Sequence, residues 1–535
     1  MSAPTKVYLF CVNSMHYCRL RKLQRKSKIF FKGIARHFSA TSQELGAVVL
    51  TLDSAAQEHM VYGQSGMLNS HPGQMRVKRV SVPTRLEKAC VAIVNKYGIG
   101  NIMKEAEGLA RYLHGRHAPV EEMELRQKAK EAEFKVRTQD GIDLYHLNPE
   151  EKRLVESQRK GKILNILRQS LYHWEPIEYD AYKGILYMLS RLVPEYAMLT
   201  SIFSEIQRRD SSFSPKTLFD FGSGIGSVAW AANAAWPHQI EEHFCVDRSA
   251  DMNMLARLLM QGGMEDRPEC FKGTFFRQVL PTSTSEKYDL VVSAFSLLEL
   301  PSRKDRLEVI DLLWKKCNNY LVLAENGTDA GYKIILEARD HILKHSHLSR
   351  TDDISQLNNE QPIISNSETY HPSNASQIGH VFSPCPHDVT CPRSIDGTNT
   401  PCNFEVPYQP LSLFKRDAEI GRDMVRFSYV VLTKGARVQE TWPRIVRPSI
   451  VRHRHVHCNL CTASGQLRRV TITAGKHKHL YRCAKKSDWG DSLPVKLAIA
   501  HDGNHTTVDD INNTKTDRPA AADLANDTGR GGEQS

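Results

Sequence analysis

Residues 217 to 236, TLFDFGSGIGSVAWAANAAW, run from a short apolar segment through closely spaced glycines into an alanine-rich segment. The apolar residues predict a buried strand and the alanine-rich residues a helix. Between them, Asp220, Gly222, Gly224 and Gly226 form the pattern D-x-G-x-G-x-G. Such glycines allow a tight turn and let a ligand approach the backbone, while the N-terminus of the following helix presents unpaired N–H groups. The stretch therefore predicts a nucleotide-type cofactor site.

A second acid lies at the end of the next predicted strand. Asp247 closes the segment HFCVD, 21 residues after Gly226, where a carboxylate can hold a ribose diol. The glycine turn lacks the Lys-Ser or Lys-Thr pair of nucleoside triphosphate sites. We therefore predict S-adenosylmethionine, a nucleoside cofactor without a pyrophosphate, held by Asp220, Gly222, Gly224, Gly226 and Asp247. A dinucleotide oxidoreductase is the alternative.

The remaining apolar segments extend this pattern. YDLVVSAFSLLEL, NYLVLAENGT and MVRFSYVVLTKG are separated by helical stretches of ten or more residues. This order predicts an α/β fold of the class I Rossmann-like S-adenosylmethionine methyltransferase type, with a largely parallel sheet. An N-terminal helical domain precedes it, and a basic, cysteine-bearing, β-rich element follows it.

We expect the following domain boundaries: a transit peptide over residues 1–43, a linker over 44–82, a helical domain over 83–210, a methyltransferase-like domain over 214–435, a basic RNA-binding element over 440–500 and a disordered tail over 501–535. Within the methyltransferase-like domain we expect a polar insertion over 341–380 and a cysteine loop over 385–402.

Charge indicates a destination and a partner. The 535-residue chain carries a formal net charge of +11, and residues 1–43 contain nine Lys or Arg and no acid. In KIFFKGIARHF the apolar and basic residues recur on opposite faces of a helix, which is typical of a mitochondrial transit peptide. We therefore predict a protein of the mitochondrial matrix. No run approaches the ~18 apolar residues of a spanning helix, so we expect no membrane partner.

Groups for methyl transfer are not evident. Methyltransferases acting on amino groups carry Asp/Asn-Pro-Pro-Tyr/Phe after the fourth strand, whereas residues 293–301 read SAFSLLELP. A cytosine C5 enzyme needs a cysteine nucleophile there, and the nearest cysteines are Cys270 and Cys317. Ser296 and Glu299 are the polar groups that could orient a substrate. We predict a cofactor site without catalytic residues.

Six of the twelve cysteines fall in the last third of the chain: Cys385, Cys391, Cys402, Cys458, Cys461 and Cys483. In a reducing compartment, clustered thiols favour a metal centre over disulfides. Four thiolates from irregular loops are typical of iron-sulfur clusters. The first three cysteines with Cys461, or with Cys458, therefore predict a [4Fe-4S] cluster. Zinc on Cys458, Cys461, Cys483 and either His477 or His479 is an alternative, because only Cys458 and Cys461 have the spacing of a zinc pair; free thiols are a third.

The segment between Glu440 and Asp488 has 47 residues without an acid, with eleven Lys or Arg and five His. Apolar residues alternate with these basic residues, which predicts a small folded element with a basic surface. Such a surface suits the phosphate backbone of a nucleic acid, and RNA would be recognised more by shape than by sequence.

At DFGSGIGSVAWAA, ENGTDAGYKII, CPHDVTCP and YRCAKKSDWGD, the sequence resembles the methyltransferase-like protein 17 family of mitochondrial small-ribosomal-subunit assembly factors, over roughly residues 83–495. The resemblance implies binding of immature small-subunit ribosomal RNA between head and body, with ribosomal proteins as further partners. It also implies retained S-adenosylmethionine binding and a [4Fe-4S] cluster. By motif, the cluster ligands would be Cys385, Cys391, Cys402 and Cys461, and the cofactor contacts Asp220, Gly222, Gly224 and Asp247.

The sequence departs from the family pattern in a wider gap between Cys391 and Cys402 and in the polar insertion before Cys385. Our expectation is an assembly factor, monomeric outside the ribosome and required for mitochondrial translation, with a methyltransferase domain that no longer transfers methyl groups. An active ribosomal RNA methyltransferase and an iron or redox sensor that gates translation are the alternatives.

Overall fold

The computed structural model describes residues 48–54, 71–96, 99–172, 174–357, 378–413, 423–437 and 441–499. Residues 50–497 form one unit. The predicted transit peptide and C-terminal tail lie outside the described residues, as do residues 358–377 of the predicted insertion. Across the described ranges, no helix has the length and apolar character needed to cross a membrane.

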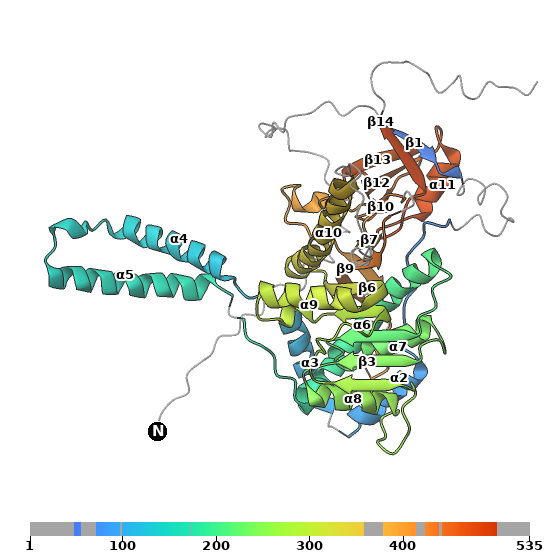
Figure 1. Ribbon diagram of the computed structural model, residues 1–535, viewed down its shortest axis with the longest axis horizontal. Coiled ribbons are helices and arrows are strands. Elements are labelled where there is room, and N and C mark those ends of the chain that lie inside the picture. The colour runs from blue at the N-terminus through green and yellow to red at the C-terminus, as the bar shows by residue number, and fades with distance from the viewer. Residues whose placement is uncertain are drawn as a thin grey trace, which may run out of the picture. The chain divides into compact units, whose positions relative to one another are not determined.

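The central sheet of the described chain has eight strands (Figure 1): β2 (Thr217–Phe221), β3 (Glu242–Val246), β4 (Thr274–Arg277), β5 (Tyr288–Ala294), β6 (Cys317–Asn326), β7 (Gly379–Ser383), β8 (Phe404–Pro407) and β9 (Met424–Lys434). Their order is β4-β3-β2-β5-β6-β9-β7, and β8 pairs with the first residues of β9. Strands β2, β3, β4, β5 and β6 run parallel to one another, whereas β9 runs antiparallel to β6 and to β7. Strand β9 is thus an antiparallel strand inserted between β6 and β7. Class I methyltransferases have this arrangement, so the predicted fold is confirmed.

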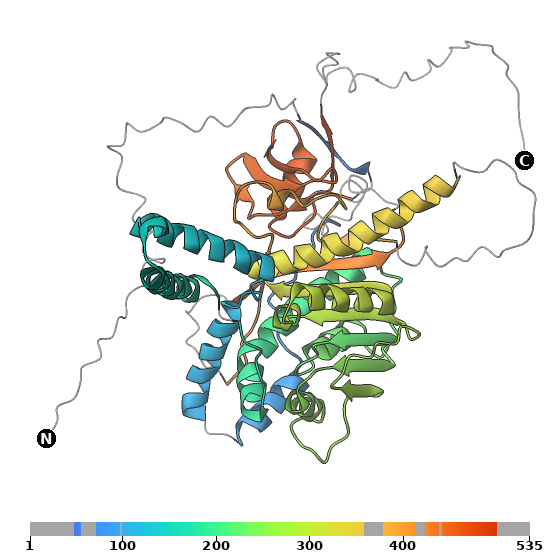
Figure 2. The ribbon, with the colours of Figure 1, turned by 60° about the vertical axis from the view of Figure 1, so that its left-hand side comes forward.

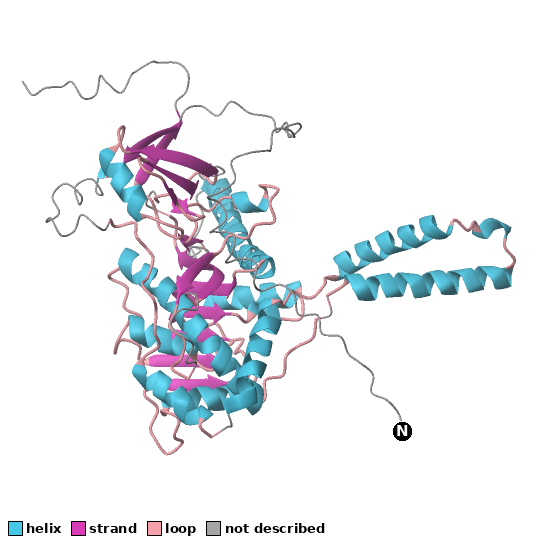
Figure 3. Ribbon diagram, turned by 180° about the vertical axis from the view of Figure 1, so that it is seen from behind, coloured by secondary structure: helices cyan, strands magenta, loops and turns pink. Residues whose placement is uncertain are grey.

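Alternation along the strands places helices on both faces of the sheet (Figure 3). Leu290 and Val292 of β5 pack in one core with α2 (Thr84–Val94), α3 (Ile99–His114), α6 (Ala181–Arg209), α7 (Ser227–Ala235) and α8 (Ala250–Met260). Val291 faces the opposite core, with α9 (Arg303–Lys316) and α10 (Asp329–Leu357). Figure 2 shows α9 and α10 together on that face.

The region predicted as a separate helical domain is divided between two structures. Helices α2, α3 and α6 belong to the core of the sheet. Helices α4 (Glu122–Asp140) and α5 (Pro149–Ser170) pack on each other as a hairpin around the 3-10 turn η1 (Leu144–His146) (Figure 1). Asn148 caps α5 with a capping box, and Arg159 holds the end of α4 by two bonds to Asp140, of 2.7 and 2.8 Å.

The C-terminal element is β-rich, as predicted. It comprises β10 (Arg444–Ile445), β11 (Ile450–Val451), β12 (His455–Cys461), β13 (Leu467–Thr473) and α11 (Lys478–Lys486). Strand β1 (Val48–Leu52) pairs with β14 (Val495–Ile499), and Leu50, Leu52 and Leu497 pack on this element's own apolar core.

Two expected loops have regular or docked structure. Part of the predicted linker, residues 71–82, is held on the C-terminal element, because Asp491 accepts bonds from the Met75 and Arg76 N–H groups at 2.8 and 3.1 Å. The predicted insertion begins as helix, since α10 continues to Leu357. Polar residues without apolar periodicity do not end a helix by themselves, and no Gly or Pro occurs between Gly331 and Pro362 to do so.

Candidate functional site

A cavity of about 460 Å³ lies at the carboxyl ends of β2, β3 and β5. Strand β3 lies next to β2 on one side, and β5 lies next to β2 on the other side. The strand order therefore reverses between β2 and β5. Ligands of open α/β sheets bind at such a switch point. The lining includes Gly222, Gly224, Asp247, Tyr179 and Tyr187.

The glycine turn is folded back onto the neighbouring strand. The Gly222 and Ser223 N–H groups donate to the Val246 carbonyl at 2.8 and 3.0 Å. Gly222 has a φ of +72°, and a Cβ atom there would lie 2.3 Å from the Ser296 Cβ. No other residue therefore fits at position 222. Gly226 is the N-cap of α7 and does not line the cavity.

Asp247 is fixed at the edge of the cavity. Its Oδ2 accepts from the Gly224 N–H at 2.8 Å, and its Oδ1 accepts from the Ser249 N–H at 2.9 Å. Burial raises the pKa of Asp247, and these two bonds oppose the rise. Its oxygens retain lone pairs on the cavity side of the turn, which is the chemistry that a ribose diol requires.

Asp220 lies behind the glycine turn, outside the cavity lining. It is fully buried, and neither carboxyl oxygen has a hydrogen-bond partner among the described residues. Burial raises the pKa of Asp220 well above its usual range, and the nearby Asp247 and Glu195 carboxylates raise it further. The structure thus places Asp220 behind the turn and outside the cavity lining, where the sequence predicted a contact with the cofactor.

Two polar side chains of the segment after β5, Ser296 and Glu299, line the cavity. Ser296 Oγ lies 2.6 Å from Ser293 Oγ and donates to the Phe221 carbonyl at 3.1 Å. Glu299, on the 3-10 turn η2 (Leu297–Glu299), pairs with Arg116 at 2.7 Å. Burial raises the pKa of Glu299, although Arg116 opposes the rise. Both polar candidates of the sequence are therefore engaged by the protein itself.

The aromatic wall of the cavity could not be found from the sequence. Tyr179 and Tyr187 lie about 40 residues before the glycine turn, with no motif around them. Phe295 has a φ of +58°, and the Arg191 guanidinium lies 4.4 Å from its ring centroid. Cys270 and Cys317 do not line the cavity.

Four of the six C-terminal cysteines meet at one point. Cys385, Cys391, Cys402 and Cys461 line the same small void, of about 10 Å³. The first three come from the loops between β7 and β8, which include the 3-10 turn η4 (Pro392–Ser394), and the fourth ends β12. Segments 59 residues apart in the chain, at Cys402 and Cys461, therefore converge here.

Strand geometry separates Cys461 from Cys458. Side chains three residues apart on a strand point to opposite faces. Cys458 lies in the apolar core of the C-terminal element with Cys483 and Leu480, whereas Cys461 points toward the cysteine loops. The structure thus places Cys461, and not Cys458, with the three loop cysteines. The zinc alternative requires Cys458, Cys461 and Cys483 together, but Cys461 lies on the opposite face of β12 from Cys458 and Cys483.

The sequence predicts either a four-iron cluster or a single zinc ion at these cysteines. Among the residues that the structure describes, no three His, Cys, Asp or Glu side chains are grouped closely enough for one metal ion. Four thiols lining one void are the donors that iron-sulfur clusters use, but the void of about 10 Å³ has no room for a cluster in this structure.

The surroundings of the void supply cationic and polar groups. Arg393 and Arg444 line it, and Arg339 braces the loop by donating to the His387 and Val389 carbonyls at 3.2 and 2.7 Å. Tyr332 Oη lies 3.4 Å from Cys391 Sγ, and His387 Nε2 lies 3.3 Å from Cys461 Sγ. Burial raises the pKa of Cys385, Cys402 and Cys461, and these guanidinium groups oppose the rise.

A basic sheet face continues from the cysteine void. On β12, His455, His457 and Asn459 lie on the same face as Cys461, and across the strand pair they stand opposite Thr473, Thr471 and Arg469. Arg452, Arg454, Lys476, Lys478, Arg482, Lys485 and Lys486 of the acid-free segment are exposed. We refer to these exposed residues, with His455, His457 and Arg469, as the basic face; those of α11 lie across the sheet from His455 and His457, because α11 packs on the side of Val456 and Cys458.

Comparisons with known proteins agree with this architecture. The Rsm22 family, described as "Mitochondrial small ribosomal subunit Rsm22", matches residues 181–351 and 368–494. The human "Ribosome assembly protein METTL17, mitochondrial" is 38% identical over 429 residues, which cover 79% of this chain and 85% of the human protein. The "Rsm22-cox11 tandem protein 2, mitochondrial" of Schizosaccharomyces pombe is 26% identical over 348 residues, 58% of this chain and 43% of that protein.

Several solved structures that resemble the chain are described as methyltransferases. The magnesium protoporphyrin IX methyltransferase of Synechocystis, with bound SAH, is 11% identical and covers 49% of this chain and 90% of its own, at a TM-score of 0.25. So low a TM-score carries no argument, and the fold assignment rests on the strand order above. The family match over more than half of the sequence and the identity to the human protein show that the chain belongs to the Rsm22 and methyltransferase-like protein 17 family of mitochondrial small ribosomal subunit proteins.

Proposed function

We propose that this protein is a mitochondrial assembly factor of the small ribosomal subunit that binds immature ribosomal RNA and does not transfer methyl groups. One observation carries the proposal: Cys461 ends the strand that bears the basic face and lies among three cysteines of the methyltransferase-like domain. A cluster held there joins the RNA-binding surface to the cofactor domain.

RNA binding is supported by charge and by shape. The acid-free segment folds as a small sheet and a helix, so its Lys, Arg and His side chains are presented from a rigid surface. Phosphates of a folded RNA are contacted by such surfaces without sequence selection. The relatives named as mitochondrial ribosome assembly proteins support ribosomal RNA as the target and mitochondria as the compartment.

Neither cofactor has a catalytic role in this proposal. Gly222, Gly224 and Asp247 would hold S-adenosylmethionine, with Asp220 behind the turn. Cys385, Cys391, Cys402 and Cys461 would hold a [4Fe-4S] cluster, which would supply covalent links between the loops and β12. A ligand that binds only the folded state stabilises it by mass action, so both groups can be retained without catalysis.

Salt-dependent RNA binding tests the proposal. We would measure binding of the purified full-length chain to small-subunit ribosomal RNA by fluorescence anisotropy over a range of salt concentrations. Arg454→Ala with Arg469→Ala removes two exposed charges of the basic face, and the slope of log K against log salt should fall in magnitude by about 1.5 to 2. Arg126→Ala with Arg137→Ala removes the same charge from α4, where both side chains are exposed.

The α4 pair should leave the slope unchanged. The proposal is wrong about the binding surface if both pairs of substitutions have the same effect. It is wrong about RNA if the wild-type chain shows no salt-dependent binding.

A further inference from the structure

The motif YRCAKKSDWGD contains a tryptophan to which the proposed function gives no role. Trp489 lines a cavity of about 280 Å³ between the C-terminal element and strands β8 and β9. Cavities for drug-sized ligands are about 300–1,000 Å³, so this one suits a smaller group. We call it the Trp489 pocket; its other lining residues include Arg76, Phe404, Glu405 and Asp488.

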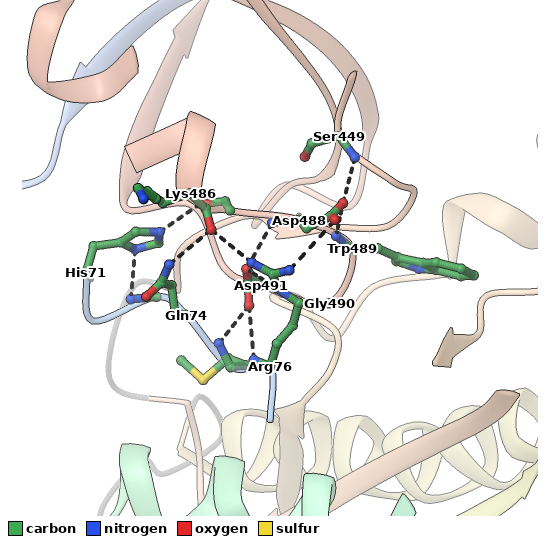
Figure 4. A network of polar contacts seen from close by, with 12 residues as sticks. His71, Gln74, Arg76, Ser449, Lys486, Asp488, Trp489, Gly490 and Asp491 are labelled. Carbon is green, nitrogen blue, oxygen red and sulfur yellow. Dashed lines mark hydrogen bonds and ion pairs between the residues drawn. The ribbon is translucent and has the colours of Figure 1, made fainter. Parts of the chain in front are cut away.

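The backbone around Trp489 is held on both sides. The fully buried Asp491 carboxylate accepts bonds from the Met75, Arg76 and Asp488 N–H groups and from Arg76 Nε, all at 2.8 to 3.1 Å. Asp488 accepts from the Ser449 and Trp489 N–H groups at 2.9 and 2.8 Å. Figure 4 shows this network, with the Trp489 indole directed away from it. A side chain so mounted is pre-organised for binding.

The indole has a donor without an acceptor. Trp489 Nε1 is buried, and among the described residues it has no hydrogen-bond partner. A buried N–H left without an acceptor costs free energy, and tryptophan can only donate. A ligand with a carbonyl oxygen or a ring nitrogen would give this donor an acceptor.

The rim of the pocket is suited to a nucleotide. The Arg426 guanidinium lies 5.9 Å from the centroid of the Trp489 ring and pairs with Glu405 at 3.2 Å. Arg76 lies at the same rim and pairs with Asp488 at 3.7 Å. Arg426 can face a phosphate, and Arg76, whose guanidinium is held by Asp491, Asp488 and the Lys486 carbonyl, adds positive charge to the rim. The two carboxylates can accept bonds from the amino group of a base. An aliphatic peptide side chain would use none of these groups.

The basic face leads to this pocket. The acid-free segment ends at Ser487, one residue before Asp488, and the exposed Lys485 and Lys486 close helix α11. An RNA strand bound along α11 therefore comes within reach of the rim. Aromatic side chains beside a positively charged path are the usual means by which proteins hold unpaired bases.

We propose that the Trp489 pocket receives one unpaired base of the bound RNA. The indole supplies a stacking surface and the Nε1–H donor, Arg426 faces an adjoining phosphate, and Arg76 adds positive charge to the rim. This inference rests on the proposed RNA-binding function and adds to it a preference for RNA with a single-stranded nucleotide.

The test compares two RNA probes on the purified full-length chain: a 12-nucleotide single strand of mixed sequence and a duplex of equal charge. Trp489→Leu should weaken single-strand binding by about tenfold, since stacking of one base contributes ~1–3 kcal/mol. It should change duplex binding by less than twofold. Trp489→Phe, which keeps a ring but lacks the N–H, should lie between. Arg469→Ala is the matched control and should weaken both probes.

Two results would overturn the inference. One is equal loss of both probes, or of neither, in Trp489→Leu. If that variant also co-sediments less with small subunits while single-strand affinity is unchanged, the pocket holds a protein segment instead. The wild-type chain gives a second, independent measurement.

With 4-thiouridine in the single strand, ultraviolet crosslinking followed by mass spectrometry should place a nucleotide on the tryptic peptide 487–496. Crosslinks on residues 444–486 without any on 487–496 would refute the pocket but leave RNA binding intact. An absence of binding by either probe would instead refute the proposed function.

Discussion

Glu205 of α6 is the buried anion that holds the C-terminal element to the methyltransferase-like domain, and its removal should be costly. Its carboxylate pairs with Arg444 and accepts from Arg209 Nη1 at 3.2 Å and from Tyr429 Oη at 3.0 Å. Arg444 also donates to the Pro384 and Gly490 carbonyls at 3.0 and 2.7 Å. One ion pair therefore connects the cysteine loop, α6 and the Trp489 segment.

The magnitude follows from the pKa of Glu205. Burial alone would raise it, but the Arg444 and Arg209 guanidinium groups outweigh burial and lower the pKa from 4.5 to about 2. A shift of that size corresponds to roughly 3 kcal/mol of stability. Because the folded pKa lies below the unfolded value, this stability is present above pH 4.5 and is lost as the pH falls toward 2.

Glu205→Gln should lower the free energy of unfolding by about 3–5 kcal/mol, because it also leaves the Arg444 charge buried and unpaired. Urea unfolding followed by tryptophan fluorescence measures the change at pH 7 and again at pH 4 and below, where the difference from wild type should shrink. Glu133→Gln, which removes an exposed pair with Arg137 at 2.6 Å, should cost less than ~1 kcal/mol. A loss no larger than this control would refute the role assigned to Glu205.

Two further changes, each with a control variant, test the sites. Cys461→Ser should abolish bound iron in protein purified without oxygen, measured by elemental analysis and visible absorbance. Cys458→Ser is the control: Cys458 lies on the same strand but faces the apolar core, so this variant should retain iron. Equal loss of iron in both variants would contradict the ligand assignment. Gly222→Ala should reduce S-adenosylmethionine affinity at least tenfold by calorimetry, because its Cβ would lie 2.3 Å from that of Ser296. Gly475→Ala, where a Cβ meets nothing within 4 Å, should bind normally, and unchanged binding in Gly222→Ala would contradict the site.

The sheet could be predicted from local patterns. Each buried strand before a helix carries a continuous apolar run, as in YDLVVSA of β5, and the run survives in any tertiary context. The glycine turn was equally clear, because only glycine fits at Gly222. Strand β4 (TFFR) and the short β7 and β8 have no such run, so they were not predicted.

The long-range part of the site depends on contacts that spacing does not encode. The sequence alone does not explain why Cys461, and not Cys458, joins the three loop cysteines. The reason is that both lie on strand β12, where residues three apart point to opposite faces. Residues 71–82 had the composition of a linker, yet Asp491 binds their backbone. In the sequence, Trp489 is only one residue of a family motif. Its pocket is lined by residues 75–77 and by β8 and β9, which are distant in the chain, so sequence spacing does not predict it.

Assembly of the small subunit tests the central claim most directly. In cells that lack the native gene, Gly222→Ala or Cys391→Ser would be expressed at equal protein levels, and small subunits would be quantified by gradient sedimentation. A non-catalytic RNA-binding factor braced by a cluster predicts normal assembly with Gly222→Ala and failed assembly with Cys391→Ser. Failed assembly with Gly222→Ala, together with loss of a methylated ribosomal RNA position, would contradict the account and show an active methyltransferase.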